Sequence, residues 1–301
     1  MMRYITRNNW LFFWLVMVYP TNLVSISIVY NFRLAQITQQ PIFEKTDDIN
    51  HIIIALAFDQ YRKKYTRSIH QNFLGALGSF IYDPRPYYFR TDFAVSHIKE
   101  KTKSKTTFSG AETDDILFTL GRNFKINEYA SLTFAGLFGI PTHKVFRLQR
   151  IDVGYSQVGL GMQFDGLYQL HHRTGLVYGA RYIYFVPRNA LGKPNQKYTL
   201  TIGNVADLII ALKNNWNNHG FELGFTERFR FGAHITPSLP DFTKKTNYIR
   251  STFYATYKYR FLIRTVQNRF LLNFSYGLDT NSKIFGNRYI ITVWASWNVS
   301  F

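Results

Sequence analysis

The sequence predicts an all-β fold, a transmembrane antiparallel β-barrel of about 12 strands. Three observations predict it. Aromatic residues make up 18% of the chain, with 28 Phe and 21 Tyr, which is more than a soluble core needs. Apolar residues reach 46%, yet after residue 30 they form none of the runs of roughly 20 residues that a membrane helix requires. They alternate with polar residues instead, as in strands that separate lipid from a wetted lumen.

The N-terminus has the three parts of a secretory signal peptide. Arg3 and Arg7 supply the charged region, and the stretch 10–18 (WLFFWLVMV) supplies the apolar core. Pro20 breaks this core, and Ser27 is a small residue next to which cleavage is expected. The apolar core is too short to span a bilayer as an uncleaved anchor. We therefore expect three regions: a signal peptide over 1–27, an N-terminal periplasmic arm over 28–48 and a transmembrane β-barrel over 49–301.

A period of two recurs along the rest of the chain. The expected strands are 49–59, 70–82, 86–98, 114–126, 129–141, 150–165, 171–186, 198–212, 217–232, 247–261, 266–279 and 287–301. The first of these (NHIIIALAFDQ) also fits a short helix or plug, which would leave one strand fewer. In 150–165 the apolar phase slips, which predicts a bulge near Ser156 and Gln157.

The final strand shows the alternation most clearly. Ile290, Thr292, Trp294, Ser296 and Asn298 form its mostly polar face, and the opposite face is apolar. A final strand that alternates in this way and ends in Phe resembles the C-terminal signature by which bacterial outer-membrane barrels are recognised for assembly. The assembly signal that this resemblance implies comprises Tyr289, Ile291, Val293, Trp297, Val299 and Phe301.

The resemblance concerns the architecture of twelve-stranded outer-membrane channels and no single family. It implies a multi-pass barrel in the bacterial outer membrane, with outer-membrane lipids and the barrel assembly machinery as partners. Barrels of this kind alternate short periplasmic turns with longer outer loops. The expected turns are 83–85, 126–128, 166–170, 213–216 and 262–265. The expected outer loops are 60–69, 99–113, 142–149, 187–197, 233–246 and 280–286.

The net charge of +18 usually indicates a nucleic-acid or membrane-surface partner. Here the basic residues stand singly between aromatics, so we expect no nucleic-acid partner and assign them to the barrel interior. The residues expected to line the lumen are Arg90, Arg173, Arg181, Arg228, Arg230, Arg250, Lys258, Arg260 and Arg288. The carboxylates expected to oppose them are Asp92, Asp207, Glu222 and Asp279.

This basic lumen favours a narrow channel for small anionic or polar solutes, because rings of Arg and Lys attract anions. The alternative is a closed structural or adhesive barrel whose outer loops bind a partner, since about 12 strands enclose a lumen that large side chains can fill.

We expect no enzyme, no cofactor and no metal site. The sequence contains no cysteine and no phosphate-binding glycine loop. His171 and His172 should point to opposite faces of a strand and so could not hold one metal ion together. Asp114 and Asp115 fit a loop end better than a protease pair at the outer rim. His97 faces outward but lacks the sequence context of a barrel phospholipase, so a barrel enzyme is the least favoured alternative.

Overall fold

The computed structural model describes residues 50–63, 69–102, 105–142, 157–191, 197–201, 203–236, 246–280 and 288–301. The predicted signal peptide and periplasmic arm lie outside the described residues, so their boundaries remain predictions. Within these ranges, no helix is long and apolar enough to cross a bilayer.

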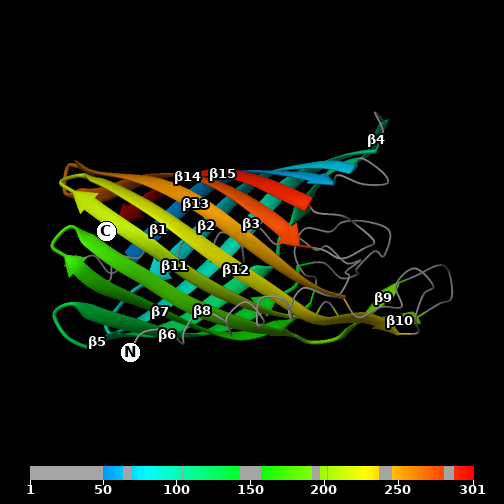
Figure 1. Ribbon diagram of the computed structural model, residues 1–301, viewed down its shortest axis with the longest axis horizontal. Helices are drawn as coiled ribbons and strands as arrows, with labels where there is room; N and C mark the ends of the chain where they lie inside the picture. The colour runs from blue at the N-terminus through cyan, green and yellow to red at the C-terminus, as the bar shows by residue number, and fades with distance from the viewer. Residues whose placement is uncertain are drawn as a thin grey trace, which may run out of the picture.

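Twelve of the described strands close a barrel, in agreement with the predicted fold class (Figure 1). They are β1 (Asn50–Lys63), β2 (Ile69–Tyr82), β3 (Tyr87–Thr102), β5 (Ile116–Lys125), β6 (Ala130–Ile140), β7 (Gly159–His171), β8 (Thr174–Phe185), β11 (Asn204–Trp216), β12 (His219–Thr236), β13 (Thr246–Ile263), β14 (Val266–Thr280) and β15 (Arg288–Ser300). Residues 50–59 of the predicted segment 49–59 are therefore strand and neither helix nor plug.

The first and last strands pair with each other, which closes the barrel. They run antiparallel from His51, opposite Ser300, to Lys63, opposite Arg288. At the start of β1 the backbones of Asn50 and Phe301 exchange two hydrogen bonds of 3.1 and 3.0 Å. Closure leaves no sheet edge, so the backbone donors and acceptors of the wall are satisfied without water.

The barrel has two different ends. Five short turns, 83–86, 126–129, 172–173, 217–218 and 264–265, share one end with Asn50 and Phe301, and we call it the turn end (Figure 1, left). At the opposite hairpin end, β4 (Lys105–Thr113) pairs with β3, and β9 (Arg188–Leu191) and β10 (Lys197–Thr201) form a hairpin beside β12. The short and long connections therefore separate as predicted, although much of the predicted outer loop 99–113 is hairpin.

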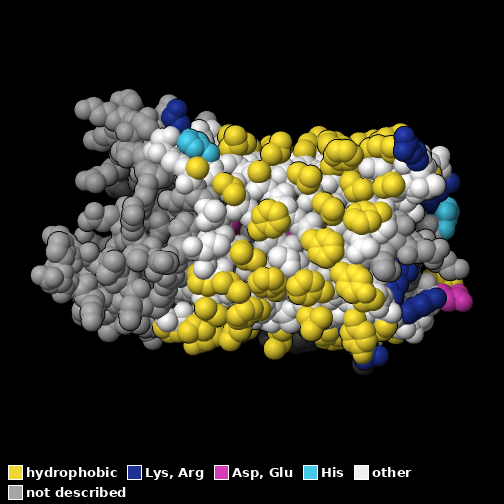
Figure 2. Space-filling view, turned by 180° about the vertical axis from the view of Figure 1, so that it is seen from behind, with side chains coloured by type: hydrophobic (Ala, Val, Ile, Leu, Met, Phe, Trp, Pro, Cys, Tyr) yellow, Lys and Arg dark blue, Asp and Glu magenta, His cyan; other side chains and the backbone are white. Residues whose placement is uncertain are grey.

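The two faces of each strand have the chemistry that the alternation predicted. In β12, Glu222, Arg228 and Arg230 are buried inside the barrel, whereas Phe221 and Leu223 are exposed on its exterior. Apolar side chains cover the exterior in the same way over the middle of the face drawn in Figure 2. An apolar surface of this extent is stable against lipid and not against water.

The predicted turn 166–170 is wrong, because β7 (Gly159–His171) continues through it and has a register shift between Gln169 and His171. Residues 159–165 of the predicted strand 150–165 are strand, whereas its first part and the bulge expected near Ser156 lie outside the described residues. The prediction took Gly166 for a turn residue. It is a strand residue against which the ring of Tyr178 packs, and a Cβ at this position would clash with that ring.

The predicted strand 198–212 and its turn 213–216 are also displaced. The barrel strand is Asn204–Trp216, and residues 197–201 belong to the β9–β10 hairpin. The turn is made by Asn217 and Asn218, and Asn217 has a φ of 51°. Asparagine tolerates this left-handed conformation better than most residues, which is why the chain reverses here and not at Lys213.

Candidate functional site

Six of the nine predicted lumen residues lie inside the barrel. They are at most 9% exposed and share their strand faces with other buried residues: Arg90, Arg181, Arg228, Arg230, Arg250 and Lys258. Of the predicted carboxylates, Asp92, Asp207 and Glu222 are buried on the same inner surface.

The other three predicted lumen residues differ. Arg173 is exposed in the turn 172–173, so its assignment to the lumen is wrong, because β7 ends later and β8 begins later than predicted. Arg260 is half-buried at the turn end, where its Nη2 donates a hydrogen bond of 3.2 Å to the carbonyl of Asn217. Arg288 begins β15, and its side chain lies outside the described residues, as does that of Asp279.

One carboxylate joins two of the predicted arginines. The Oδ2 of Asp207 lies 2.6 Å from Nη2 of Arg181, and its Oδ1 lies 2.6 Å from Nε of Arg228. All three residues are at most 4% exposed. They stand directly opposite one another on β8, β11 and β12, so strand register brings them together. A buried carboxylate shared by two guanidinium groups leaves this cluster with an excess of positive charge.

The series of directly opposed charged residues continues on the next strands around the wall. After Arg228 on β12 come, each directly opposite the one before, Arg250 on β13, Asp279 on β14, Arg288 on β15 and Lys63 on β1. Together with Arg181 and Asp207, these residues place one charged position on each of seven neighbouring strands, from β8 to β1, and we call them the charged row. Barrel strands are tilted, so a row of directly opposed residues climbs around the wall. The sequence analysis named most of these residues but could not align them.

A second ion pair lies on the other side of the barrel. Arg90 and Asp92 share the inner face of β3, with Nη2 and Oδ1 2.6 Å apart. The hydroxyl of Ser79 on β2 donates to Asp92 and accepts a hydrogen bond of 3.1 Å from Arg90. This pair is locally neutral.

The inner wall is electrically uneven. The described basic residues on the inner face of β8 and β11–β14 are Arg181, Lys213, Arg228, Arg230, Arg250, Lys258, Arg260 and Arg269. The described acidic residues on the inner face of the same strands are Asp207 and Glu222, whereas Glu227 of β12 has the outward phase. On the other half of the wall, from β1 to β7, the described buried charges are Arg90, Asp92, Asp114, Asp115 and Asp165.

The sequence analysis missed two basic members of this wall. Lys213 was assigned to a turn, but it is only 8% exposed inside β11, opposite Glu222. Arg269 shares a strand face with Leu271 and Asn273, which are 0% and 2% exposed. The alternation of apolar and polar residues in β14 would have assigned Arg269 to the inner face. Lys213 could be assigned to it only once the turn was placed at 217–218 instead of 213–216.

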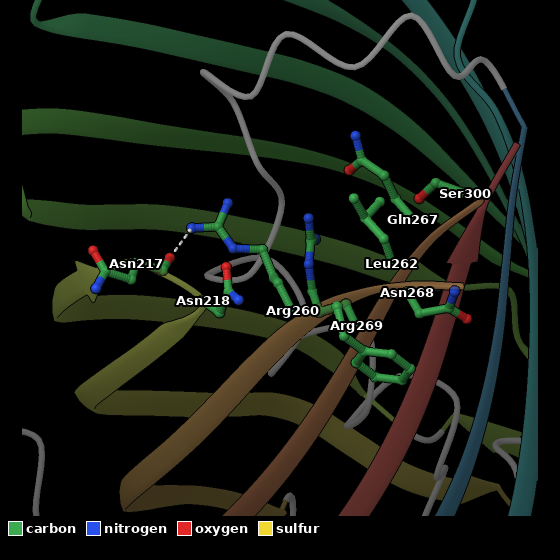
Figure 3. Close-up of a pocket in the computed structure, with 9 residues that line it drawn as sticks. Asn217, Asn218, Arg260, Leu262, Gln267, Asn268, Arg269 and Ser300 are labelled. Atoms are coloured by element: carbon green, nitrogen blue, oxygen red, sulfur yellow. Dashed lines mark hydrogen bonds between the residues drawn. The ribbon is translucent and has the colours of Figure 1, made fainter. Parts of the chain in front are cut away.

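One described pocket near these residues opens at the turn end (Figure 3). It has a volume of about 400 Å³. Arg260 and Arg269 stand directly opposite each other on β13 and β14 and both line it. The remaining lining residues are Asn217, Asn218, Phe261, Leu262, Gln267, Asn268 and Ser300, so none of those described is acidic.

The residues weighed for catalysis do not form a catalytic site within the described part of the chain. Asp115 donates its backbone N–H to Asp114 Oδ1 at 2.7 Å, and the pair lies at the start of β5 as expected for a loop end. His97 is exposed on the exterior, with Nε2 3.2 Å from the hydroxyl of Ser109. No described carboxylate or amide holds its other ring nitrogen, so the pair lacks the group that orients a catalytic histidine.

The two adjacent histidines contradict the expectation that they point apart. Nδ1 of His172 lies 3.0 Å from Nε2 of His171, because His172 belongs to the turn and no longer follows the strand alternation. No group of three or more metal-binding side chains exists among the described residues.

No protein-family model matches the chain, and no curated protein matches it in sequence. Solved structures do resemble it. An outer membrane channel from Pseudomonas putida F1 has a TM-score of 0.63 at 10% identity, covering 84% of this chain and 97% of the other. The translocator domain of the autotransporter NalP from Neisseria meningitidis has a TM-score of 0.52 at 9% identity, covering 90% and 95%.

At such low identity these similarities concern the fold alone. They agree with the closed barrel, the lipid-facing exterior and the expected association with membrane lipid. The protein is a twelve-stranded antiparallel β-barrel of the bacterial outer membrane.

Proposed function

We propose that this protein is an outer-membrane channel whose interior favours small anionic solutes. The observation that carries the proposal is the uneven distribution of charge on the inner wall. The inner face of β8 and β11–β14 has eight described basic side chains and two described acidic ones. The fold is shared with an outer membrane channel from another bacterium, which is consistent with transport.

The charges act strongly because of where they lie. A barrel wall surrounded by lipid has a low dielectric constant, so the field of buried cations is focused into the interior instead of being screened by water. Arg181 and Arg228 share one carboxylate, and the net positive charge that remains raises the local concentration of anions. The same positive potential repels cations and lowers their concentration along this wall.

One observation favours the alternative of a closed structural barrel. The side chains of Arg181 and Asp207 are both 0% exposed, and the inward Trp294 is 4% exposed. Passage of a solute along this wall therefore requires these side chains to move.

Conductance in planar lipid bilayers separates the two functions. The wild-type protein should conduct, and its reversal potential in a salt gradient should indicate anion preference. Changing Arg228, Arg230 and Arg250 together to Glu should shift the reversal potential toward cations, because all three lie on the inner wall. Phe253→Leu is the matched outward control on β13, where Phe253 is 59% exposed.

Heat-modifiable mobility on gels should first establish that each variant is folded. If the triple Glu variant does not fold, Arg230→Gln tests the same wall without charge reversal and should reduce the anion preference. A folded variant that keeps wild-type selectivity would contradict the proposed path. A folded wild type without conductance would favour the closed barrel.

A further inference from the structure

We propose that Arg122, on the exterior of the barrel, binds the phosphate of an anionic phospholipid headgroup. Such a site is independent of the proposed channel function, because Arg122 lies on the outer face of the wall and not in the lumen.

Arg122 is a cation on a face that is otherwise largely apolar. It is exposed and has the same phase in β5 as Leu120 and Phe124, which are 65% and 38% exposed on the exterior. A cation on the lipid-facing side of a barrel is costly at the bilayer centre, and the cost falls toward the interface. Arg122 lies near the end of β5, just before the turn 126–129. It is therefore placed where the apolar band of the exterior ends and lipid headgroups begin.

Two aromatic rings hold the guanidinium group of Arg122. Its Cζ lies 5.2 Å from the ring centroid of Tyr87, which is directly opposite on β3, and 4.9 Å from the ring centroid of Phe124. Both distances are within the range of cation–π interactions. Phe124 is closer to the turn than Arg122, so the side chain of Arg122 leans toward the turn end. A long basic side chain that leans in this way brings its charge to the depth of the headgroups.

The contacts of Arg122 leave its hydrogen-bond donors available. Stacking on aromatic rings uses the faces of a guanidinium group, whereas its N–H donors lie along the edge. Among the described residues, the side-chain contacts of Arg122 are with these two rings, and no carboxylate pairs with it. The edge of a guanidinium group matches two oxygens of a phosphate in a bidentate geometry. At a membrane surface, lipid headgroups supply this phosphate.

The surroundings of Arg122 suit a phospholipid better than a free phosphate ion. Phe134 is directly opposite Arg122 on β6 and is 53% exposed on the exterior. Its ring lies at an edge-to-face angle to that of Phe124, with centroids 6.0 Å apart. These rings form an apolar surface beside the cation, as aromatic residues do at membrane interfaces. A phospholipid can cover this surface with its acyl chains while its phosphate reaches Arg122, and a free phosphate ion cannot.

The charge of the turn end favours an anionic headgroup. Figure 2 shows most of the Lys and Arg side chains of the drawn face at this end, on the right, next to the apolar band. Besides Arg122, the exposed basic residues described there include Arg85, Lys125, Arg173 and Arg264, whereas the described acidic residues in its turns are Asp83 and Glu128. Basic residues at a membrane surface attract anionic lipids.

Native mass spectrometry of the folded full chain in detergent, titrated with dioleoyl phosphatidylglycerol, tests the site. Heat-modifiable mobility should first show that each variant is folded. The test variant is Arg122→Gln, and the matched control is Arg264→Gln, which removes the same charge from the exposed turn between β13 and β14 at the same end. A third variant, Tyr87→Leu/Phe124→Leu, keeps the charge of Arg122 and removes the two rings that hold it.

Wild type and control should retain phosphatidylglycerol alike. Arg122→Gln should need about tenfold or more lipid for the same occupancy, as expected when charge-assisted hydrogen bonds are lost. The third variant should also bind more weakly than wild type, because its guanidinium group is no longer held at the headgroup depth. Inorganic phosphate at the concentration of the lipid should not displace it, since the acyl chains contribute to binding.

Equal retention by Arg122→Gln and Arg264→Gln, or no retained lipid in any folded protein, would overturn the site. Displacement by equimolar inorganic phosphate would overturn the assignment to a lipid. If Arg122→Gln does not fold, Arg122→Lys and the third variant decide, and wild-type retention by both would overturn the site. Because this readout needs no ion flow, its failure is distinct from a failure of the proposed channel function.

Discussion

Asp207 and Arg181 form an ion pair of 2.6 Å inside the barrel, with both side chains 0% exposed. They are 26 residues apart in sequence and directly opposite in the sheet. The same carboxylate binds Arg228, so a single acidic residue holds two buried cations on neighbouring strands.

Replacing Asp207 with Asn should destabilise the barrel strongly. The change leaves Arg181 and Arg228 buried without their shared carboxylate, and breaking a buried ion pair from one side costs about 3–5 kcal/mol. Urea unfolding in lipid vesicles, followed by loss of heat-modifiable mobility, measures the effect. The combined variant Asp207→Asn/Arg181→Gln/Arg228→Gln should be less destabilised than Asp207→Asn alone, and the reverse order would contradict the shared-carboxylate arrangement.

The outward Trp297 should be sensitive to charge. It is 47% exposed on the barrel exterior, and its Nε1 donates a hydrogen bond of 3.0 Å to Asn268. Trp297→Asp places a charge against lipid, at a cost below the roughly 2–4 kcal/mol measured for Arg or Lys at the bilayer centre. Membrane yield should fall, while Trp297→Phe should assemble normally.

Deletion of Phe301 tests the assembly signal separately. Phe301 is 50% exposed, so its loss removes little packing from the barrel. If the terminal aromatic is recognised during assembly, the outer-membrane yield should fall although the purified variant still refolds in detergent. An unchanged yield would contradict a role of the terminal Phe301 in assembly.

Single cysteines can establish which end of the barrel faces outward. The chain has no native cysteine, so an introduced thiol is labelled without background. Lys99→Cys lies at the hairpin end, opposite Ser109 of β4, and should react with an impermeant reagent on intact cells. Arg264→Cys, in the turn 264–265, should react only after the outer membrane is opened. The opposite result would invert the predicted orientation.

The pKa of His172, in the turn 172–173, should depend on its neighbour His171. Desolvation and the neighbouring charges of His171 and Arg173 lower the pKa of His172. Because the folded pKa is below the unfolded one, stability linked to this group is present above the ordinary histidine pKa and is lost as the pH falls through the lowered value. NMR titration should show the pKa of His172 rising in His171→Gln. His97→Gln is the control, and no rise in the first variant would contradict the coupling.

The sequence alone determined the fold class and the face of each strand. Side chains alternate with a period of two, so the buried Ser296 and the exposed Trp297 were already assigned to opposite faces of the last strand. Turns were harder to locate. Gly166 and Lys213 were read as turn residues from local composition, but the cross-strand fit of Tyr178 and the pairing with Glu222 keep both inside strands.

The tertiary structure alone decided which charges meet. Register is a relation between strands that no single segment encodes, and a shift of one residue would move every side chain to the other face. The sequence therefore determined that Asp207 and Arg228 point inward, but only the register of β11 with β8 and β12 placed that carboxylate between Arg181 and Arg228. The same register set Arg260 against Arg269, because the tight turn at 264–265 fixes how β13 and β14 align.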